Sequence, residues 1–342
     1  MKALRIYGGR DLRYEDVADP YPGHGLIKIR IHLAGICGSD VKEYSTSSGL
    51  IPVDKIPLTI GHEFMGRVAE VGEGVNEFNV GDRVSGVGYR YCDSCFYCKR
   101  GLYNLCLKSH FMGMDIDGCM ADYVIAPAYA TYKLPDSISD ECGTLVEPLA
   151  VSIHAIRQGK INPGDVIAIV GDGTIGLGTL LAAKVSGASA VYLVSKHENR
   201  GKLALEIGAS KVIYLSDTDP VQSIKDLTDG LGADVVVECV GNPDSLQLAV
   251  NLARRGGTIV LVGVATKPSS INFGEIMFFE KNIIGSAIYI HEAKTAIAML
   301  ADRRMDPSCL ITSIAPLKNA VEKGFEKLLS NKENNLKILL RP

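Results

Sequence analysis

The segment from residue 166 to residue 263 alternates short apolar runs with stretches of helical pattern. The apolar runs are rich in Val, Ile and Leu, which is typical of parallel strands covered on both faces. These expected strands are Val166 to Val170, Ala190 to Val194, Lys211 to Leu215, Asp234 to Cys239 and Thr258 to Gly263. The expected helices lie at 175–187, 198–208, 219–229 and 243–254. This alternation predicts a doubly wound α/β domain.

The first 149 residues show a different pattern, in which glycine and proline turns separate short strand-like runs. Such runs predict a β-rich domain. They are Leu26 to Leu33, Gly66 to Val71, Asp82 to Val87 and Ala121 to Ala126. Beyond about residue 290 the pattern becomes irregular again. We therefore expect an α/β chain with a catalytic domain at 1–149 and 286–342 and a dinucleotide-binding domain at 150–285, with the active site in the cleft between them.

Length, charge and cysteine usage narrow the class further. With 342 residues the chain can bury two cores. Its formal net charge of -3 argues against a nucleic-acid or anionic-membrane surface. No apolar stretch approaches the roughly 20 residues that span a bilayer, and the N-terminus lacks the apolar core of a signal peptide. We therefore expect a cytoplasmic protein, in which nine cysteines indicate metal ligation or catalysis rather than disulfides.

A glycine-rich motif, G-D-G-T-I-G, follows the first of the expected parallel strands and opens a helical pattern. In that context the motif is typical of a dinucleotide-binding loop. Gly171 would permit the tight turn, Gly173 the approach of a pyrophosphate, and Gly176 the packing of helix on strand. Thr174 and Ile175 begin the helix, whose free amides would face the phosphates. The motif therefore predicts a nicotinamide dinucleotide site.

Four cysteines lie within fifteen residues, with the spacing C-x2-C-x2-C-x7-C. They are Cys92, Cys95, Cys98 and Cys106. Four thiolates can close a tetrahedron around Zn²⁺ and leave no position open for a substrate, so a zinc ion here would be structural. The alternatives are unrelated thiols and an iron–sulfur cluster, whose usual ligand spacing this run does not match well. The spacing favours structural zinc.

A second set of candidate ligands is spread along the first 147 residues. Cys37 lies in G-I-C-G-S-D, His62 and Glu63 come directly after a glycine, and Glu147 lies in V-E-P-L. Taken singly, Cys37 is also compatible with a core thiol, His62 with a turn residue and Glu147 with a carboxylate at the start of a helix. Thiolate, imidazole and carboxylate are also ligands of zinc sites that keep a position open. Spacing alone leaves both interpretations open.

The order of motifs along the whole chain resembles a known family, the zinc-containing medium-chain alcohol and polyol dehydrogenases. The motifs are G-I-C-G-S-D, G-H-E-x2-G-x5-G-x2-V, G-D-R-V, the four-cysteine run, E-P-L and G-D-G-T-I-G. Glu147 at the third ligand position is similar to the sorbitol and 2,3-butanediol dehydrogenase branch. The opening M-K-A-L-R, the segment after Glu147 and Lys337-Ile338-Leu339 look closest to the butanediol dehydrogenases. The resemblance implies a GroES-like catalytic domain, a Rossmann domain, and hydride transfer between a secondary alcohol and a nicotinamide cofactor.

Carried over by motif position, the resemblance also implies the residues of the active site. Cys37 and His62, with Glu147 or Glu63, would bind a catalytic zinc ion, and the two carboxylates would exchange with water during turnover. Ser39 matches the family's proton-relay hydroxyl. We therefore expect catalytic roles for Ser39, Glu63 and Glu147.

The outer end of that proton relay departs from the family pattern. Relatives commonly have a histidine where this chain has Lys42. Lysine is normally protonated at neutral pH and is then a poor base. We expect Lys42 to be a solvated or cofactor-phosphate residue rather than a relay base.

The turn after the second parallel strand bears on the choice between NAD and NADP. NAD-specific relatives end this strand with an Asp or Glu that binds the adenine ribose, whereas here the sequence continues S-K-H-E-N-R. Ser195 can hydrogen-bond a 2′-phosphate, and Lys196 and Arg200 can neutralise it. The alternative is a solvated basic turn whose charge Glu198 partly offsets. We predict that NADP is preferred over NAD. The other expected cofactor contacts are Val262, Gly263, Val264, Ser286, Ala287 and Ile288.

The substrate is constrained by Ile288 and Tyr289. The polyol branch often has an arginine just before this tyrosine, to hold hydroxyls far from the metal. Its absence favours a short vicinal diol or hydroxyketone of the 2,3-butanediol/acetoin type, with a small polyol still open. Alternatives are an L-threonine 3-dehydrogenase-like enzyme, a zinc-free quinone or enoyl reductase, and a non-enzymatic zinc-lobed binding protein. Since relatives are usually tetramers paired near 283–288, we also expect a homo-oligomer, a tetramer or dimer.

Overall fold

The computed structural model describes residues 1–265 and 267–342 and divides into two compact units. Unit 1 comprises Met1–Glu147, Ala293–Arg303 and Leu310–Pro342. Unit 2 comprises Pro148–Glu292 and Arg304–Cys309. The helix α3 (Val146–Gln158) begins with the last residues of the first segment of unit 1 and continues into unit 2. The domain limits expected from the sequence, at 149/150 and 285/286, stay a prediction.

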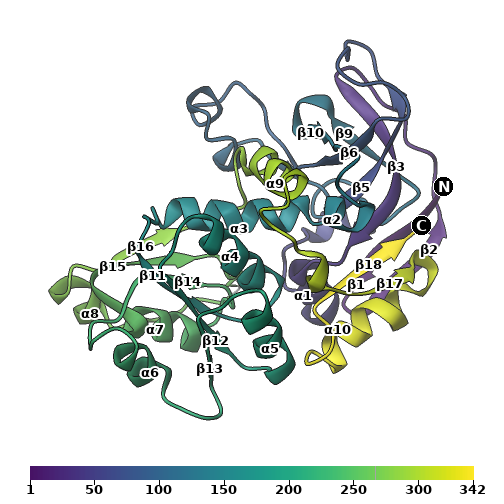
Figure 1. Cartoon of the computed structure of the whole chain (residues 1–342). Helices are drawn as coiled ribbons and strands as arrows, with labels where there is room; N and C mark the ends of the chain where they lie inside the picture. Colours follow the sequence, from purple (N-terminus) through teal and green to yellow (C-terminus); the bar gives the residue numbers. More distant parts are fainter. Residues whose placement is uncertain (266) are drawn as a thin grey trace. The chain divides into compact units, whose positions relative to one another are not determined.

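Unit 2 is built on a six-stranded parallel sheet with the order β13-β12-β11-β14-β15-β16. Its strands are β11 (Val166–Val170), β12 (Ala190–Ser195), β13 (Lys211–Tyr214), β14 (Ala233–Glu238), β15 (Ala253–Leu261) and β16 (Asn282–Gly285). Its helices are α4 (Thr174–Val185), α5 (Glu198–Glu206), α6 (Pro220–Asp226), α7 (Pro243–Leu252) and α8 (Phe273–Phe278). In Figure 1, α4 and α5 lie on one side of this sheet and α6 and α7 on the other. The order reverses between β11 and β14, which is the doubly wound arrangement that the sequence predicted.

The strands form where the sequence places unbroken apolar runs. Four of the five residues of β11 and five of the six of β12 are buried. They pack with β14 and α7 in one apolar core, as expected for strands covered on both faces. The expected strand Thr258 to Gly263 is wrong at its start, because β15 begins at Ala253. The extra residues pair with β14 across an irregularity in the register, so the preceding helix ends at Leu252.

Unit 1 contains a seven-stranded sheet with the order β10-β6-β5-β3-β18-β17, in which β9 also pairs with β3. A three-stranded sheet, β2-β1-β4, and the pair β7-β8 complete it. The strands are β1 (Lys2–Gly8), β2 (Asp11–Asp16), β3 (Leu26–Gly35), β4 (Leu58–Thr59), β5 (Glu63–Val71), β6 (Arg83–Gly86), β7 (Tyr89–Arg90), β8 (His110–Phe111), β9 (Tyr123–Pro127), β10 (Thr131–Lys133), β17 (Ile311–Pro316) and β18 (Lys337–Arg341). The helices are α1 (Gly38–Thr46), α2 (Asp140–Thr144), α9 (Glu292–Ala301) and α10 (Glu326–Ser330).

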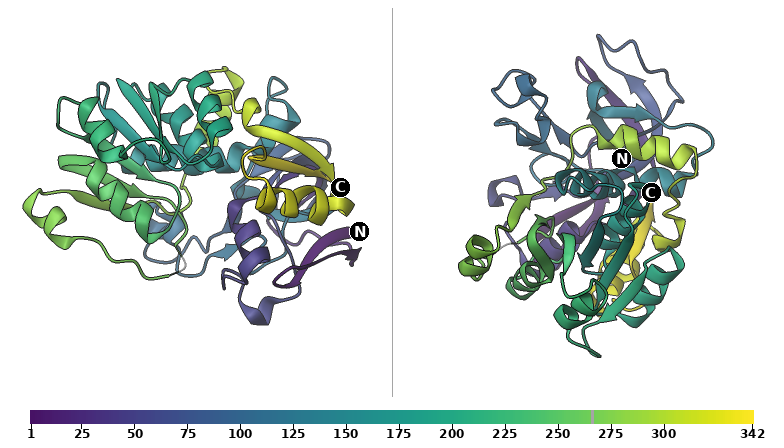
Figure 2. Two further views of the ribbon diagram at one scale, coloured as in Figure 1. Left: turned by 90° about the horizontal axis from the view of Figure 1, so that it is seen from below. Right: turned by 60° about the vertical axis from the view of Figure 1, so that its left-hand side comes forward.

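The end of the chain is more regular than the sequence suggested. The sequence pattern beyond about residue 290 is irregular, yet α9, β17, α10 and β18 lie there. The two strands pair in parallel, and Figure 2 shows α10 running beside them. β18 also pairs with β3, where Leu339 lies opposite Gly35. The last strand therefore lies beside the chain segment that leads to Cys37.

None of the helices in residues 1–265 and 267–342 combines the length and the apolar character that a membrane crossing requires.

Candidate active site

Cys37 lies at the point where β3 gives way to α1. The strand ends at Gly35, and Cys37 adopts an extended backbone directly before the first residue of the helix. Its backbone amide donates a hydrogen bond of 2.9 Å to Oδ2 of Asp40, whose side chain is buried. This hydrogen bond at the start of the helix fixes the backbone from which the Cys37 thiol projects.

His62 is fixed by a glycine that no other residue replaces easily. Gly61 has a φ of +95°, and a Cβ there would lie 2.7 Å from Cγ of Met120. His62 is buried, and its Nδ1 lies 3.9 Å from Oδ1 of Asp40. Burial alone would lower the pKa of His62, but the negative charges of Asp40 and Cys37 raise it well above its ordinary value. With Nδ1 facing an acid, Nε2 is the nitrogen available to a metal.

Glu63, the first residue of β5, is held by a lysine from the far end of the chain. Lys337 of β18 donates to both carboxylate oxygens at 2.7 Å and to the carbonyl of Ile36 at 2.9 Å. Both side chains are at most 2% exposed. A Cβ on Gly35 would collide with Oε2 of Glu63, so the carboxylate lies against β3. Glu63 as a zinc ligand stays a prediction, and in the structure its carboxylate is engaged by Lys337.

Glu147 enters this region from the first turn of α3 and is also buried. Burial, against the opposing charge of His62 and together with the negative charge of Glu63, raises the pKa of Glu147 to about 7. The negative charges of Cys37 and Glu147 raise the pKa of His62 in turn. Three side chains that are far apart in sequence thus share one electrostatic environment. In the described residues, the ligand atoms of Cys37, His62 and Glu147 do not all lie within 4.8 Å of one another.

The donor set fits a zinc ion that keeps an open coordination position. Thiolate, imidazole and carboxylate are its usual ligands. The buried carboxyl groups of Asp40, Glu63 and Glu147 face one buried lysine, Lys337, and a divalent cation would offset their excess negative charge. Oγ of Ser39 is one of the buried atoms without a hydrogen-bond partner in the described part of the chain. Such atoms are expected where a bound group is to be oriented.

The four cysteines of the sequence motif are brought together as expected. All four sulfur atoms lie within 4.8 Å of one another, and all nine cysteines of the chain are free thiols. Backbone amides of Cys92 and Lys108 donate to Sγ of Cys106 at 3.3 Å. The Ser94 hydroxyl and amide lower the pKa of Cys92 to about 6. Four thiols with amide donors around them fit a closed zinc site.

The glycine-rich loop joins β11 to α4 and is open toward a ligand. Gly171 has a φ of +111°, and a Cβ on Gly176 would collide with the carbonyl oxygen of Gly171. A Cβ on Gly173 would meet nothing within 4 Å. Thr174 and Ile175 form the first turn of α4, and no side chain caps that end of the helix. The free amides and the open approach fit the pyrophosphate of a dinucleotide.

Ser195 at the end of β12, Lys196 in the turn after it and Arg200 in the first turn of α5 contact an acid that the sequence analysis did not single out. Oγ of Ser195 donates to Oδ2 of Asp172 at 2.7 Å, and Arg200 reaches Oδ1 at 3.4 Å. Lys196 is exposed at the start of the turn. The structure thus brings the three predicted phosphate contacts to one turn, and engages two of them with Asp172.

Comparison with known proteins decides the family. A model of the alcohol dehydrogenase GroES-like domain matches residues 23–136, and one of the zinc-binding dehydrogenases matches residues 174–302. The sorbitol dehydrogenase of Halalkalibacterium halodurans is 35% identical over 100% of this chain and 99% of that protein. The chain belongs to the zinc-containing medium-chain alcohol and polyol dehydrogenases. The family and the GroES-like and Rossmann fold class inferred from the motifs are confirmed.

Solved structures of this dehydrogenase family superimpose over the whole chain. The 2R,3R-butanediol dehydrogenase of Bacillus subtilis has a TM-score of 0.92 at 35% identity, covering 100% of this chain and 99% of that one. A zinc-binding dehydrogenase of Sinorhizobium meliloti bound to NADP has a TM-score of 0.91 at 30% identity with the same coverage. The chain is therefore an alcohol dehydrogenase by family, and the substrate and the choice of cofactor are separate questions.

The remaining predicted cofactor contacts of this dehydrogenase follow two neighbouring strands. Val262, Gly263 and Val264 come after β15, and the amides of Val262 and Gly263 donate to the carbonyl of Glu238 in β14. Ser286, Ala287 and Ile288 come after β16. Both segments therefore lie at the carboxyl edge of the sheet, where ligands of doubly wound domains bind. Tyr289, cited for the substrate, is fully buried.

Sequence analysis did not single out three polar residues of the structure, namely Lys337, Asp172 and Cys119. Lys337 was noted only as part of a family-like segment, although one lysine in the run K-I-L-L was a signal of a paired buried charge. Asp172, the acid inside the glycine-rich motif, was likewise visible and not used. Cys119 left no signal of its own. Its thiol lies 3.4 Å from the carbonyl of Glu63, and burial raises its pKa well above the ordinary value.

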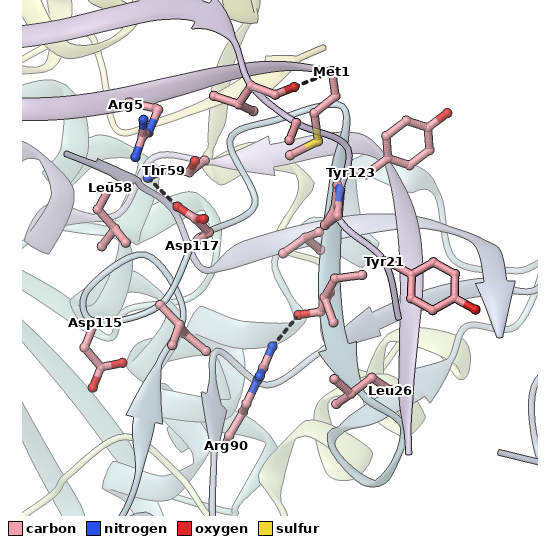
Figure 3. A pocket seen from close by; sticks show the side chains of 17 residues that line it. Met1, Arg5, Tyr21, Leu26, Leu58, Thr59, Arg90, Asp115, Asp117 and Tyr123 are labelled. Carbon is pink, nitrogen blue, oxygen red and sulfur yellow. Dashed lines mark hydrogen bonds between the residues drawn. The ribbon is translucent and has the colours of Figure 1, made fainter. Parts of the chain in front are cut away.

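A cavity of about 650 Å³ in unit 1 does not belong to this site (Figure 3). Arg5, Tyr21, Arg90 and Tyr123 are among the residues that line it, and none of the predicted site residues does. Some of its polar groups have partners inside the chain, such as Nη2 of Arg90, which donates to the carbonyl of Ile125 at 3.1 Å. We assign it no role in the dehydrogenase reaction.

Proposed function

We propose that this dehydrogenase transfers a hydride between NADP(H) and a secondary alcohol, a short vicinal diol or hydroxyketone of the 2,3-butanediol/acetoin type or a small polyol. The cluster of half-buried Cys37 with buried His62 and Glu147, with its excess of acidic groups, is the observation that carries the proposal. These residues would hold the catalytic zinc. When bound, zinc supplies Lewis acidity at the alcohol and the nicotinamide ring accepts the hydride.

The residues around the cluster would position groups and move a proton. Asp40 would orient the ring of His62 through Nδ1, and Lys337 would hold Glu63 against β3. Ser39 would accept the proton of the substrate hydroxyl at its Oγ, a buried atom with no other hydrogen-bond partner in the described residues, and would pass its own hydroxyl proton on to the next group of the relay. Desolvation of this pocket strengthens each of these contacts, because charges interact more strongly away from water.

The proposed preference for NADP(H) rests on the turn after β12. An acid at the end of this strand would repel a 2′-phosphate, and the strand ends in Ser195 instead. Lys196, next to it, is exposed and has no ion-pair partner in the described part of the chain. An exposed cation beside the adenosine ribose favours a 2′-phosphate over a 2′-hydroxyl.

The proposed substrate class rests on Ile288 and Tyr289. An apolar side chain at residue 288 offers no charged group to distant hydroxyls, so binding energy would come from the carbons of a short substrate. The names of the relatives, which include a sorbitol and a butanediol dehydrogenase, give the two chemical classes to compare.

One experiment separates these possibilities. Zinc-loaded protein is assayed for formation of the reduced cofactor from 2,3-butanediol, sorbitol and L-threonine, each with NADP and with NAD, before and after chelation. We expect the highest kcat/KM for the diol with NADP, and loss of activity on chelation. A higher kcat/KM for L-threonine would contradict the substrate class, and one for NAD would contradict the cofactor preference.

Assembly and compartment are proposed on separate grounds. β16 is an edge strand of the six-stranded sheet, so its free backbone groups suit pairing with a second copy, in a dimer or tetramer. The nine free thiols suit the reducing cytoplasm. Light scattering and cell fractionation test the two proposals.

A further inference from the structure

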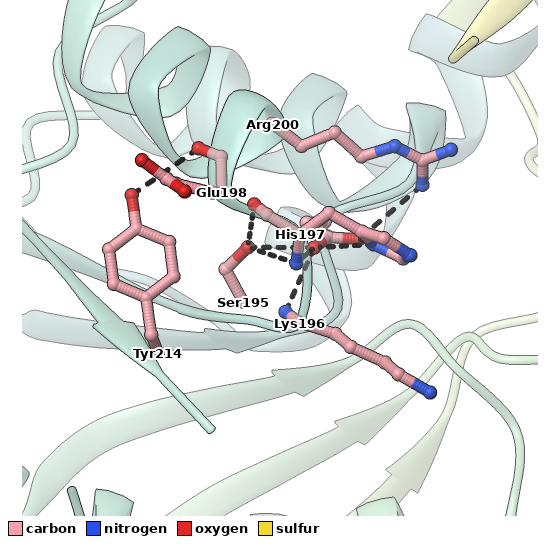
Figure 4. A network of polar contacts seen from close by, with 7 residues as sticks. Ser195, Lys196, His197, Glu198, Arg200 and Tyr214 are labelled. Atoms are coloured by element: carbon pink, nitrogen blue, oxygen red, sulfur yellow. Dashed lines mark hydrogen bonds and ion pairs between the residues drawn. The ribbon is translucent and has the colours of Figure 1, made fainter. Parts of the chain in front are cut away.

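The side chain of Asp172 is the centre of a network that ties the glycine-rich loop to the turn after β12 (Figure 4). Oδ2 accepts hydrogen bonds from Oγ of Ser195 at 2.7 Å and from the amides of Lys196 and His197, both at 2.9 Å. Oδ1 lies 3.1 Å from Nδ1 of His197 and 3.4 Å from Nη1 of Arg200. The carboxylate is buried, at 7% exposure. One side chain thus holds the backbone and the side chains of the turn.

The carboxylate has no hydrogen-bonding capacity left for a cofactor. A carboxylate offers about four lone-pair sites, and the groups around Asp172 already provide two amides, a hydroxyl, an imidazole nitrogen and a guanidinium. Burial alone would raise the pKa of Asp172, but the Ser195 and His197 contacts hold it below the ordinary value. Asp172 therefore does not replace the ribose-binding acid of NAD enzymes.

The cationic side chains around this turn differ in whether a carboxylate pairs with them. Arg200 and His197 lie against Asp172, and Glu198 forms an exposed pair with Lys202 at 2.7 Å. Lys196 contributes only its backbone amide to the network, and its side chain points away from it in Figure 4. In the described part of the chain Lys196 is therefore the cation of this turn that no carboxylate pairs. Its backbone is fixed by Asp172 while its ammonium group stays available.

We infer that Asp172 is a positioning residue for recognition of the cofactor's 2′-phosphate, which it achieves by fixing the backbone of Lys196. The inference rests on the proposed use of NADP(H). A long flexible lysine loses less conformational entropy on binding when its backbone is already held. Asp172 also belongs to the glycine-rich loop that would approach the pyrophosphate. The loop and the turn after β12 are therefore held by the same side chain. Asp172 acts through Lys196 and does not touch the phosphate.

The test measures binding rather than turnover. Full-length zinc-loaded protein is titrated by calorimetry with adenosine 2′,5′-bisphosphate and with adenosine 5′-monophosphate. The wild type is expected to bind the bisphosphate more tightly. Asp172→Asn should weaken bisphosphate binding by about tenfold, the effect of one lost charge-assisted contact, and change 5′-monophosphate binding by less than about twofold. Lys196→Ala should show the same selective loss.

Glu198→Gln is the matched control, because it removes one negative charge from the same turn without touching the network. It should leave the ratio of the two affinities unchanged. Amide hydrogen exchange adds a readout that needs no ligand: residues 196 and 197 should exchange faster in Asp172→Asn and not in Glu198→Gln. If Asp172→Asn does not fold, Ser195→Ala should give a smaller loss in the same direction.

Four results would overturn the inference. Tighter bisphosphate binding in Asp172→Asn would mean that the carboxylate repels the phosphate. Equal weakening of both ligands would mean a general role in loop folding, and unchanged amide exchange would mean that the turn is held without Asp172. A wild-type preference for the bisphosphate that is the same size in Asp172→Asn would overturn the inference alone. Equal wild-type affinities for the two ligands would instead contradict the proposed NADP(H) preference and, with it, the selectivity role.

Discussion

The two candidate zinc sites of this dehydrogenase are built in opposite ways. The four cysteines lie within fifteen residues of one another, in a lobe that contains short turns of 3-10 helix. In the other cluster, Cys37 directly precedes α1, His62 directly precedes β5, and Glu147 lies in the first turn of α3. Two of the four cysteines are half-buried, as is Cys37, whereas His62 and Glu147 are buried among other titratable groups.

This difference indicates different uses for the two sites. A lobe whose ligands are local and whose helices are short 3-10 turns depends on the metal for its shape. A buried cluster is instead held by the core and by ion pairs such as Lys337 with Glu63, and its excess charge is then available to a metal and a substrate. The first site should matter mainly for stability and the second mainly for chemistry. Four substitutions test this division.

The largest effect is expected for His62→Ala. We expect kcat/KM to fall by about a thousandfold or more, because a metal ligand supports several kcal/mol of charge stabilisation. Elemental analysis should show one zinc per chain instead of two, with the four-cysteine site still filled and the fold retained by circular dichroism. His24→Ala, which changes an exposed histidine of the same unit, is the control. Full activity in His62→Ala would break the comparison.

A large loss of stability is expected for Lys337→Met. Removing one partner of a buried ion pair leaves the other charge uncompensated, which costs about 3–5 kcal/mol. The free energy of unfolding in urea measures this, and the double variant Lys337→Met/Glu63→Gln should recover much of it. The exposed pair offers the control, since Lys202→Met should cost less than about 1 kcal/mol. Similar losses in Lys337→Met and Lys202→Met would show that the cluster is not held by the pair of Lys337 and Glu63.

A moderate effect is expected for Cys95→Ser. We expect the Tm of unit 1 to fall by about 4–8 °C, the shift that a loss of about 2 kcal/mol gives in a domain of that size, and the zinc content to fall by one ion per chain. The kcat at low temperature should stay near that of the wild type. Calorimetry and metal analysis check both, with Cys309→Ser, an exposed cysteine, as the control. A loss of kcat equal to that of His62→Ala would remove the distinction between the sites.

The smallest effect is expected at a buried acid of unit 2 that is no candidate metal ligand. Burial alone would raise the pKa of Glu292, but His154, the amide of Ile290 and Arg157 hold it well below its ordinary value. A lowered pKa gives stability that is complete above the unfolded-state value and is lost as the pH falls through about 4. Glu292→Gln should therefore cost about 1–2 kcal/mol at pH 7 and progressively less on acidification. A pH-independent cost in urea unfolding would refute this.

Where the pattern is local, sequence reasoning predicted the structure well. β11 has the bounds that its apolar run predicted, and the four cysteines meet because fifteen residues cannot carry them far apart. The start of β15 was wrong because pairing with β14, not apolar character, extends that strand to Ala253. The helices α9 and α10 and the strands β17 and β18 were not predicted, because their apolar faces become continuous only against the rest of unit 1.

Sequence by itself determined the alternating strands and helices of unit 2, the glycine-rich loop and the closed four-cysteine site, because each depends on residues that are neighbours along the chain. Only the tertiary structure decided that Lys337 pairs with Glu63, 274 positions away, and that Asp172 holds the turn of Lys196. Such contacts join buried charged groups whose partners are set by strand order and burial. A one-dimensional pattern records neither, since the same acid can be paired, solvated or bound to a ligand according to what the fold places beside it.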